Sequence, residues 1–387
     1  MSLFNIAPVT VDDYRRIAQR RLPKFLFDYI DGGANREEIL ARNCGDFSQL
    51  QLKQRVLRDV GSIDTATTLF GRSMAMPVAL APVGMAGLFR RRGETQAARA
   101  AERCGIPFAT STVGVCPVDE VAASVAEPIW FQLYMLRDRD FVLEMLERAR
   151  NAGVDTLLFT VDLPVPGMRQ RDFRNGMIGG GTAGKISKLA QILSSPRWIY
   201  DVGLRGKPHT FGNVASKVEN PKDLDLYKSF IDGQFDPTVT WSDIAWLRQQ
   251  WHGKLIIKGV MESDDALAAI DCGAEGIVVS NHGGRQLDGI ASPIAKLPGV
   301  ARAVNRQCSI MLDSGVRNGI DVVKALACGA DAVLLGRPWV YAMAAGGEQG
   351  VVDLLEMINK EVEIAMALMG VNRIDEITGE LLDSDLW

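Results

Sequence analysis

The segment 280–287, Ser-Asn-His-Gly-Gly-Arg-Gln-Leu, holds the residues best suited to chemistry. It contains Arg285 and His282, one of only three histidines among 387 residues. A neutral imidazole can take a proton, and a guanidinium can hold a carboxylate through two parallel hydrogen bonds. Gly283 and Gly284 release both side chains from the end of the apolar run 276–279, which we expect to be a buried strand. The segment therefore predicts a base beside an anion anchor.

Acidic and basic residues near 162–171 could complete this unit. Asp162 follows another apolar run, and a carboxylate there could fix the histidine tautomer and stabilise the imidazolium formed on proton transfer. Arg169 or Arg171 could supply a second arm of an anion clamp, and the sequence does not choose between them. His209 and His252 lack such neighbours, so we expect them at the surface.

Two glycine-containing loops, 313–319 and 336–337, predict a phosphate site. Glycines let backbone N–H groups approach phosphate oxygens, while Arg317 and Arg337 supply charge and forked donors. The alternative is a pair of helix-capping turns with solvated arginines. Lys258 ends a further apolar run, where it could stabilise negative charge on a cofactor ring, form a Schiff base, or extend into solvent.

A repeated pattern indicates how these residues are positioned. Segments 151–162, 271–280 and 327–336 each end a helix at a glycine, continue through an acidic residue and enter a short apolar strand; 102–111 is a looser copy. Repeated helix-to-strand joints predict a (β/α)₈ TIM barrel. An open doubly wound sheet is disfavoured because no GxGxxG turn follows the first strand. The predicted strands are 77–81, 108–111, 130–134, 156–161, 255–258, 276–279, 310–313 and 332–335, with helices at 94–103, 140–152, 242–251, 263–270 and 319–327.

Polar side chains follow the carboxyl ends of nearly all these strands. In a barrel these ends converge on one mouth, where such folds place their chemistry. The residues concerned are Ser111, Gln132, Tyr134, Thr160, Asp162, Lys258, Ser280, His282, Asp313 and Arg337.

We expect one domain over residues 1–387. An N-terminal helical cap covers 1–75, with two helices in 11–33 and Pro23 at the start of the second. The barrel covers 76–345 and carries an insertion at about 163–240 after its fourth strand, and C-terminal helices cover 346–387. An insertion of that length is typical of a lid or a binding element.

Composition excludes several classes of protein. Apolar residues make up 47%, charged residues 23%, and the net charge is −4, so nothing indicates nucleic-acid binding. Residues 1–5 lack the basic start and apolar core typical of a signal peptide, so we expect none, and no run of 18 apolar residues occurs. The six scattered cysteines predict reduced thiols, without disulfides or a metal site.

The chain resembles the FMN-dependent L-2-hydroxy acid oxidases and dehydrogenases over almost its whole length. The Ser-Asn-His-Gly-Gly-Arg-Gln motif at 280–286 is the family's highly specific signature. Within the family the similarity is greatest to the bacterial respiratory L-lactate dehydrogenases, on segments 22–29, 79–84, 130–134 and 159–162.

The resemblance implies FMN-dependent oxidation of L-lactate to pyruvate. It makes His282 the base that takes the hydroxyl proton as the α-hydrogen passes to flavin N5, with Asp162 as its partner. It makes Arg285 and Arg169 the carboxylate clamp, and Tyr29 and Tyr134 the tyrosines that bind the substrate carboxylate and hydroxyl. Lys258 would lie near flavin N1 and O2. Further cofactor contacts are Ala81, Pro82, Val83, Ser111, Gln132, Thr160 and Ser280 at the ring and ribityl chain, and Asp313, Gly315, Arg317, Gly336 and Arg337 at the ribityl and phosphate end.

The substrate and electron acceptor depend on two other regions. Val113 and Pro166 match the lactate-type pattern, which favours a short aliphatic acid over mandelate. In 185–193, Ile186, Leu189, Ile192 and Leu193 share one helical face, followed by the aromatic segment 196–200, which predicts a monotopic membrane contact. We thus expect electron transfer to a membrane quinone and a peripheral location on the cytoplasmic side of the inner membrane; the family also implies a homotetramer.

Other readings stay open at this point. The insertion helix could be an ordinary lid, and the protein a soluble cytoplasmic oxidase that uses oxygen or a mandelate-type dehydrogenase. A phosphate-binding barrel lyase or isomerase would use Lys258 as a Schiff base. A flavin-binding membrane scaffold would have no activity.

Overall fold

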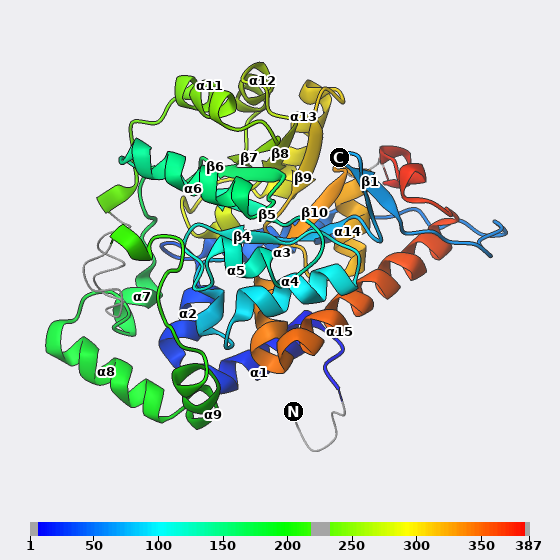
Figure 1. The fold of residues 1–387 in the computed structure, drawn as a ribbon. Helices are drawn as coiled ribbons and strands as arrows, with labels where there is room; N and C mark the ends of the chain where they lie inside the picture. The colour runs from blue at the N-terminus through cyan, green and yellow to red at the C-terminus, as the bar shows by residue number, and fades with distance from the viewer. Residues whose placement is uncertain (1–6, 218–232, 384–387) are drawn as a thin grey trace.

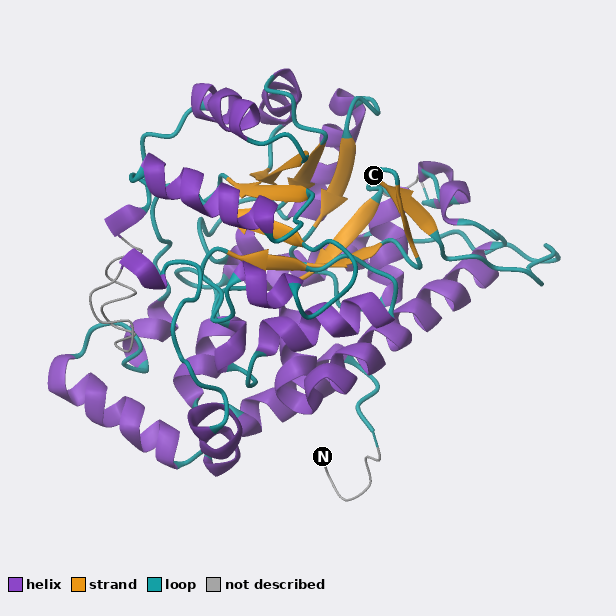
Figure 2. Cartoon of the chain, viewed as in Figure 1, coloured by secondary structure: helices purple, strands orange, loops and turns teal. Residues whose placement is uncertain are grey.

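Eight parallel strands form the barrel that the repeat predicts (Figures 1 and 2). The computed structural model describes residues 7–217 and 233–383. The strands hydrogen-bond in the order β3-β10-β9-β8-β7-β6-β5-β4. A parallel bridge between Leu80 and Phe108 joins the two ends of this order. All eight predicted strands are confirmed: β3 (Val78–Leu80), β4 (Ala109–Ser111), β5 (Trp130–Leu133), β6 (Thr156–Thr160), β7 (Lys254–Val260), β8 (Gly276–Val279), β9 (Ser309–Leu312) and β10 (Ala332–Leu335).

An antiparallel hairpin fills the N-terminal end of the barrel. It consists of β1 (Thr67–Leu69) and β2 (Arg72–Met74), and Leu69 and Met74 belong to the buried cluster inside the barrel. Phe70, at the turn, packs edge-on against Trp130 with ring centroids 6.2 Å apart. A Cβ on Gly276 would lie 2.7 Å from the Phe70 ring, so only glycine fits there. The carboxyl ends of the strands therefore form the usable mouth.

Helices surround the strands and include all five that the sequence predicts. Ser, Thr, Asn and Asp side chains cap several of them, as in the reciprocal capping box of Thr240 and Asp243. The C-terminal helix α15 (Arg337–Met369) bends at Gly347 (φ 67°, ψ −148°) and packs along α1 and α4. The others are α4 (Gly93–Arg103), α5 (Val118–Ala122), α6 (Arg139–Asn151), α11 (Trp241–Gln250), α12 (Ser263–Asp271), α13 (Pro293–Val304) and α14 (Gly319–Ala327).

The N-terminal helices α1 (Val11–Arg21), α2 (Lys24–Asp31) and α3 (Glu38–Gly45) precede the barrel. Pro23 is the N-cap of α2 rather than its first residue, one position earlier than predicted. Helix α2 buries Phe25, Leu26 and Phe27, and its carboxyl end reaches the mouth of the barrel. This placement brings backbone carbonyl groups of residues 29–32 to the arginines described below.

The insertion after β6 contains α7 (Gln170–Arg174), α8 (Gly181–Leu193), α9 (Pro196–Trp198) and a π-helical turn, Ile199–Leu204. Ile186, Leu189 and Leu193 are 57–65% exposed. The predicted apolar face is wrong at Ile192, which packs against the core because Gln191, beside it, binds the Phe25 amide of α2 at 2.7 Å. Residues 218–232 of the predicted insertion lie outside the described residues.

Two further expectations for the insertion need correction. Trp198 faces inward, and its indole donates to the Leu88 carbonyl oxygen at 2.7 Å. His209 is partly buried, with Nε2 2.7 Å from the Val202 carbonyl oxygen, whereas His252 is exposed. Across the described residues, no helix combines the length and apolar character needed to cross a membrane.

Candidate active site at the mouth of the barrel

A cavity of about 270 Å³ lies at the carboxyl ends of the strands. The side chains predicted for substrate binding and most of those predicted for the cofactor line it. They are Tyr29, Tyr134, Arg169, His282 and Arg285 for the substrate, and Ala81, Pro82, Val83, Gln132, Thr160, Lys258, Asp313, Gly315, Arg317, Gly336 and Arg337 for the cofactor. Asp162, Ser111 and Ser280 contact these residues from behind.

His282 and Asp162 form a buried pair, with Nδ1 2.7 Å from Oδ1 and side chains 19% and 12% exposed. His282 has φ 57°, a conformation rarely adopted by residues other than glycine. The bond to Asp162 places a proton on Nδ1 and leaves Nε2 as the basic nitrogen. The pair can therefore accept a proton from a molecule in the cavity.

For each member of this pair, burial and the charge of the other member shift the pKa in opposite directions. Burial lowers the pKa of His282, and Asp162 offsets only part of that effect. Burial alone would raise the pKa of Asp162, but His282 and Lys258 hold it below its ordinary value. A neutral imidazole beside a carboxylate anion is the state required of a general base.

Two arginines lie beside the ring of Tyr29. The Arg285 guanidinium lies 4.6 Å from the centre of the Tyr29 ring, and that of Arg169 lies 5.9 Å from it. Burial, with repulsion from Arg169, lowers the pKa of Arg285 to about 10. Asp172 also lines the cavity and its charge acts on Arg285, but the two arginines keep this part of the cavity positive, which suits an anionic ligand.

The structure separates the two arginines that the sequence left equivalent. Arg171 points away from the cavity and binds Asp31 at 2.8 Å and also Glu37. Arg169 lines the cavity, and its Nε is buried with no hydrogen-bond partner. Arg169 is therefore the available second arm of the clamp.

Tyr134 directly follows β5, lines the cavity and packs edge-on against Phe235, with ring centroids 5.2 Å apart. Burial, reinforced by the Asp162 carboxylate, raises the pKa of Tyr134. Its hydroxyl therefore keeps its proton at neutral pH and can donate a hydrogen bond.

Lys258 is 5% exposed and lies 3.0 Å from Asp313 Oδ2 and 2.9 Å from Ser280 Oγ. Burial alone would lower its pKa, but Asp313 and Asp162 raise it above the ordinary value. A lysine that stays protonated is a poor nucleophile. This geometry disfavours the Schiff-base lyase and suits a fixed positive charge.

Gln132 is a polar residue of the cavity wall, between these groups and the far end of the cavity. It accepts from Ser111 Oγ at 3.0 Å and donates to Thr160 Oγ1 at 3.1 Å. Ser111 thus orients Gln132, as Ser280 supports Lys258. Both serines are one layer away from the cavity.

At the far end of the cavity, formed by residues 313–317 and 336–337, Arg317 and Arg337 differ in how many of their N–H donors are free. Arg337 donates to the carbonyl oxygens of Ile30, Gly32 and Gly283 at 2.7–2.9 Å, so it holds the end of α2 in place. Among the residues that the structure describes, Arg317 makes one side-chain hydrogen bond, to Val316 O. Gly315 has φ 124°, and a Cβ there would lie 1.9 Å from Asn43 O. Glycine is therefore required at 315 by its packing against Asn43, and its backbone lines the cavity.

These features fit FMN, the cofactor that the resemblance implies. The apolar residues 81–83 form one wall for a flat ring, and Lys258 supplies positive charge at another wall of the cavity. The glycine at 315 and the arginine at 317 end the cavity where a phosphate would lie. No group of His, Cys, Asp or Glu within the described residues is arranged to hold a metal ion.

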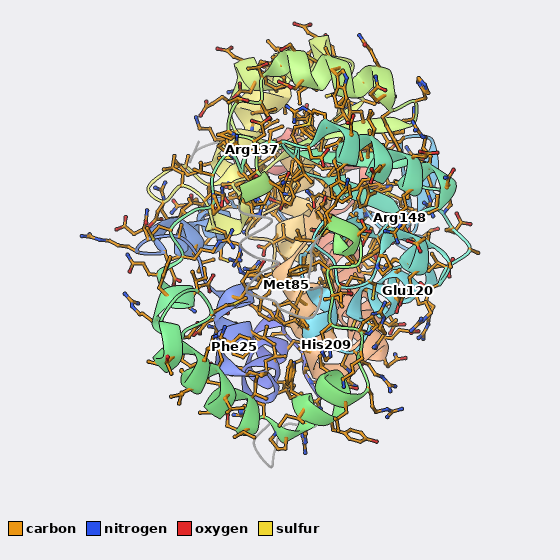
Figure 3. All side chains as sticks on the ribbon, turned by 60° about the vertical axis from the view of Figure 1, so that its left-hand side comes forward. Phe25, Met85, Glu120, Arg137, Arg148 and His209 are labelled. Atoms are coloured by element: carbon orange, nitrogen blue, oxygen red, sulfur yellow. The ribbon has the colours of Figure 1, made fainter. Side chains whose placement is uncertain are left out.

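The cavity also has an apolar outer part that the sequence did not reveal. Phe25, Met85, Leu88, Met177 and Phe211 line it. Figure 3 shows Phe25 beside α8 and Met85 nearer the middle of the same side. These residues come from four separated segments, so no local pattern could have assembled them. The ion pairs of Arg171 with Asp31 and Glu37 were missed for the same reason.

Comparison with known proteins agrees with this geometry. The family described as FMN-dependent dehydrogenase matches residues 18–384. An L-lactate dehydrogenase of Alcaligenes faecalis is 52% identical over 370 residues, covering 96% of this chain and 97% of that protein. An L-lactate dehydrogenase of Stenotrophomonas maltophilia (strain R551-3) is 54% identical over 365 residues, covering 94% and 96%.

Solved structures show the same fold. The monotopic membrane protein (S)-mandelate dehydrogenase matches with a TM-score of 0.91 and 34% identity, covering 98% of this chain and all of that chain. A mandelate oxidase matches with a TM-score of 0.82 and 35% identity, covering 97% and 98%.

Proposed function

This chain belongs to the FMN-dependent dehydrogenase family, and we propose that it oxidises L-lactate to pyruvate with FMN as its cofactor. The observation that carries this conclusion is the His282–Asp162 pair, 2.7 Å apart, in the same cavity as two arginines. Such a site can hold a short 2-hydroxy acid by its carboxylate and deprotonate its hydroxyl.

The chain's residues divide this reaction among them. Arg285 and Arg169 would bind the substrate carboxylate, with Tyr29 beside them. Tyr134 would donate to the substrate hydroxyl or carboxylate. His282 Nε2 would take the hydroxyl proton, and Asp162 would stabilise the resulting imidazolium. When bound, FMN supplies the two-electron oxidant that accepts the α-hydrogen with its electron pair.

Cofactor binding would rest on three groups of side chains. Gln132 and Thr160 would contact the ring and ribityl chain, and Arg317 with the backbone at Gly315 would hold the phosphate. Lys258 would lie beside the part of the ring that gains negative charge on reduction, because Asp313 and Ser280 fix its ammonium at that wall.

Substrate size is set by side chains above the ring site. Val113, Leu163 and Pro166 line this region. Gly84 has no room for a larger residue, since a Cβ would lie 2.7 Å from Val113 Cγ2. The lactate assignment is supported by relatives at 52–54% identity, against 34% for the mandelate dehydrogenase structure.

We further propose that the electrons pass to a membrane quinone and that the insertion contacts the cytoplasmic face of the inner membrane. Ile186, Leu189 and Leu193 supply an exposed apolar face on α8, and Tyr200 and Leu204 follow it, 60% and 63% exposed. Residues 177–217 also contain one acidic residue, Asp201, and six basic ones: Lys185, Lys188, Arg197, Arg205, Lys207 and Lys217. This combination is typical of monotopic contact with an anionic membrane. A homotetramer stays a prediction.

Three measurements test this function. Anaerobic L-lactate should bleach the flavin spectrum of the purified protein, whereas mandelate should do so more slowly. Stoichiometric hydrogen peroxide under air, with the protein wholly in the soluble fraction, would instead establish an oxidase.

The His282→Gln variant tests the base. It should keep its flavin but lose turnover by about 10²–10⁴-fold, the usual cost of removing a general base. Unchanged turnover in that variant would refute the assigned role.

A further inference from the structure

A second cavity, of about 600 Å³, lies at the junction of α1, the α8–α9 connection and the bend of α15. It is separate from the active site, and no residue lines both cavities. Its walls include Tyr14 and Arg20 from α1, Ser195 from the connection, Arg197 from α9 and Gly346 from α15. No role in lactate oxidation accounts for it.

This cavity concentrates positive charge. Arg20, Arg21 and Arg197 line it, against one acidic residue, Asp353. Within residues 7–217 and 233–383, the exposed Arg20 and Arg197 have no hydrogen bond or ion pair. Arg21 is half-buried and donates to the carbonyl oxygens of Ala344 and Ala345. Burial, together with repulsion from Arg90 and Arg197, lowers the pKa of Arg21.

Hydrogen bonds fix the backbone beside Arg197. The Trp198 indole is bonded to Leu88 O at 2.7 Å, which anchors α9 next to Arg197. Ser195 Oγ donates to Gln191 O at 3.2 Å, which ties the connection to the end of α8. The cavity therefore presents three guanidinium groups. Arg21 is fixed by its bonds to the Ala344 and Ala345 carbonyl oxygens, while Arg20 and Arg197, unpaired within the described residues, are free to bind a ligand, which suits the oxygens of a phosphate.

The position of the cavity identifies the source of that phosphate. Leu193, the last residue of α8, is 65% exposed and belongs to the apolar face. Ser194, the next residue, already lines the cavity. Figure 1 shows α8, α9 and α1 together at one edge of the molecule. When the apolar face enters a bilayer, the cavity lies at the depth of the lipid headgroups.

We propose that this cavity binds the phosphate headgroup of an anionic phospholipid, an inference that rests on the proposed membrane contact of α8. The three arginines neutralise the headgroup, while Ile17 and Pro196 on the cavity walls contact the apolar part of the lipid near it. The orientation of the protein on the membrane is then set by a specific binding site, and not only by nonspecific electrostatic attraction.

Vesicle co-sedimentation of the flavin-loaded protein tests this proposal. The vesicles are pure phosphatidylcholine, or phosphatidylcholine with phosphatidylglycerol. The wild type should bind the anionic vesicles much more tightly than the neutral ones. Arg20→Gln/Arg197→Gln should lose about 30-fold of that affinity, the equivalent of about 1 kcal/mol for each basic residue near an anionic surface.

Two control variants lose the same charge elsewhere. Arg205→Gln/Lys207→Gln removes two basic residues of the insertion that do not line the cavity. Arg302→Gln/Arg306→Gln removes two exposed residues in and just after α13, at the opposite end of the molecule (Figure 1). Both should bind anionic vesicles more tightly than the cavity variant, and lactate should bleach the flavin in all of them.

The outcomes separate the two proposals. Equal losses in the cavity variant and in Arg205→Gln/Lys207→Gln would overturn the headgroup site in favour of nonspecific electrostatic attraction. Saturable binding of inorganic phosphate to the wild type, together with equal binding of the wild type and the cavity variant to anionic vesicles, would overturn the lipid as the source. Equal binding of the wild type to both vesicles would overturn the site but keep the membrane contact. No binding to either vesicle would overturn both.

Discussion

Replacing Asp162 with asparagine isolates the contribution of one carboxylate charge to the base. The substitution keeps the size of the side chain and an oxygen that can accept from His282 Nδ1. It removes the negative charge that lies 2.7 Å from the imidazole. The amide can also turn its NH₂ group towards Nδ1, which would place the imidazole proton on Nε2 and block the base.

The size of the effect follows from the distance and the burial of the pair. Centres of charge about 4 Å apart attract by about 4 kcal/mol at an effective dielectric constant of about 20. That attraction exists only once His282 has taken the substrate proton, so it acts mainly on the transition state. Losing it should lower kcat about 10³-fold.

Stopped-flow reduction of the flavin by anaerobic L-lactate measures this step directly. The flavin content and the KM for lactate should change little, because Arg285 and Arg169 remain. A fall of less than tenfold in the rate of reduction would refute the reasoning, since the carboxylate would then contribute no more than a surface charge.

The same variant makes a prediction about pH. The base must be neutral, so kcat/KM should rise with pH through the pKa of His282. Burial puts this pKa below the ordinary value of 6.5, so the wild type should already be on its plateau at neutral pH. Asp162 raises the pKa of His282, so Asp162→Asn should move this limb to lower pH. A shift to higher pH would contradict the assignment.

Three further variants test other parts of the site. Arg285→Lys should raise the KM for lactate about 10–100-fold in steady-state assays, the usual cost of lost hydrogen bonds to a charged group; an unchanged KM would remove Arg285 from the clamp. Gly283→Ala should lower the flavin-to-protein ratio after gel filtration, because its Cβ would lie 2.5 Å from Arg337 Nη1. Gly289→Ala, also at positive φ but with no atom within 4 Å, should retain flavin. Asp31→Asn should lower the free energy of unfolding at pH 7 by about 2 kcal/mol, because the pKa of Asp31 is about 2 in the folded protein against 3.8 ordinarily. This contribution is present above pH 4 and lost as pH falls towards 2, so urea titrations of the wild type and variant should converge there.

The barrel could be predicted because its information is local. Each helix-to-strand joint repeats within about ten residues, and each strand is apolar on both faces. The polar residues at the strand ends then fall on one mouth by geometry alone. This is why most of the residues named from the sequence line one cavity.

The rest depends on contacts between distant segments. Arg169 and Arg171 look alike in the sequence, and what separates them is Asp31, which binds Arg171 across 140 residues of chain. Ile192 and Trp198 fit an exposed apolar pattern but turn inward because α2 and the Leu88 carbonyl oxygen lie beside them. Arg337 looks like a phosphate ligand, yet three of its donors hold backbone carbonyl groups.

The end of α2 also constrains the order in which the protein can be built. Carbonyl groups of residues 29, 30 and 32 accept from Arg285 and Arg337, which follow them by as many as 307 residues. On the ribosome, the N-terminal helices are synthesised first, but their last turn has none of these partners until residue 285 emerges and lacks the others until residue 337 does. We therefore expect the active site to be among the last parts of the molecule to become ordered, and a nascent chain that ends before residue 337, which also lacks α15 and its packing against α1, α4 and α14, to have no competent site.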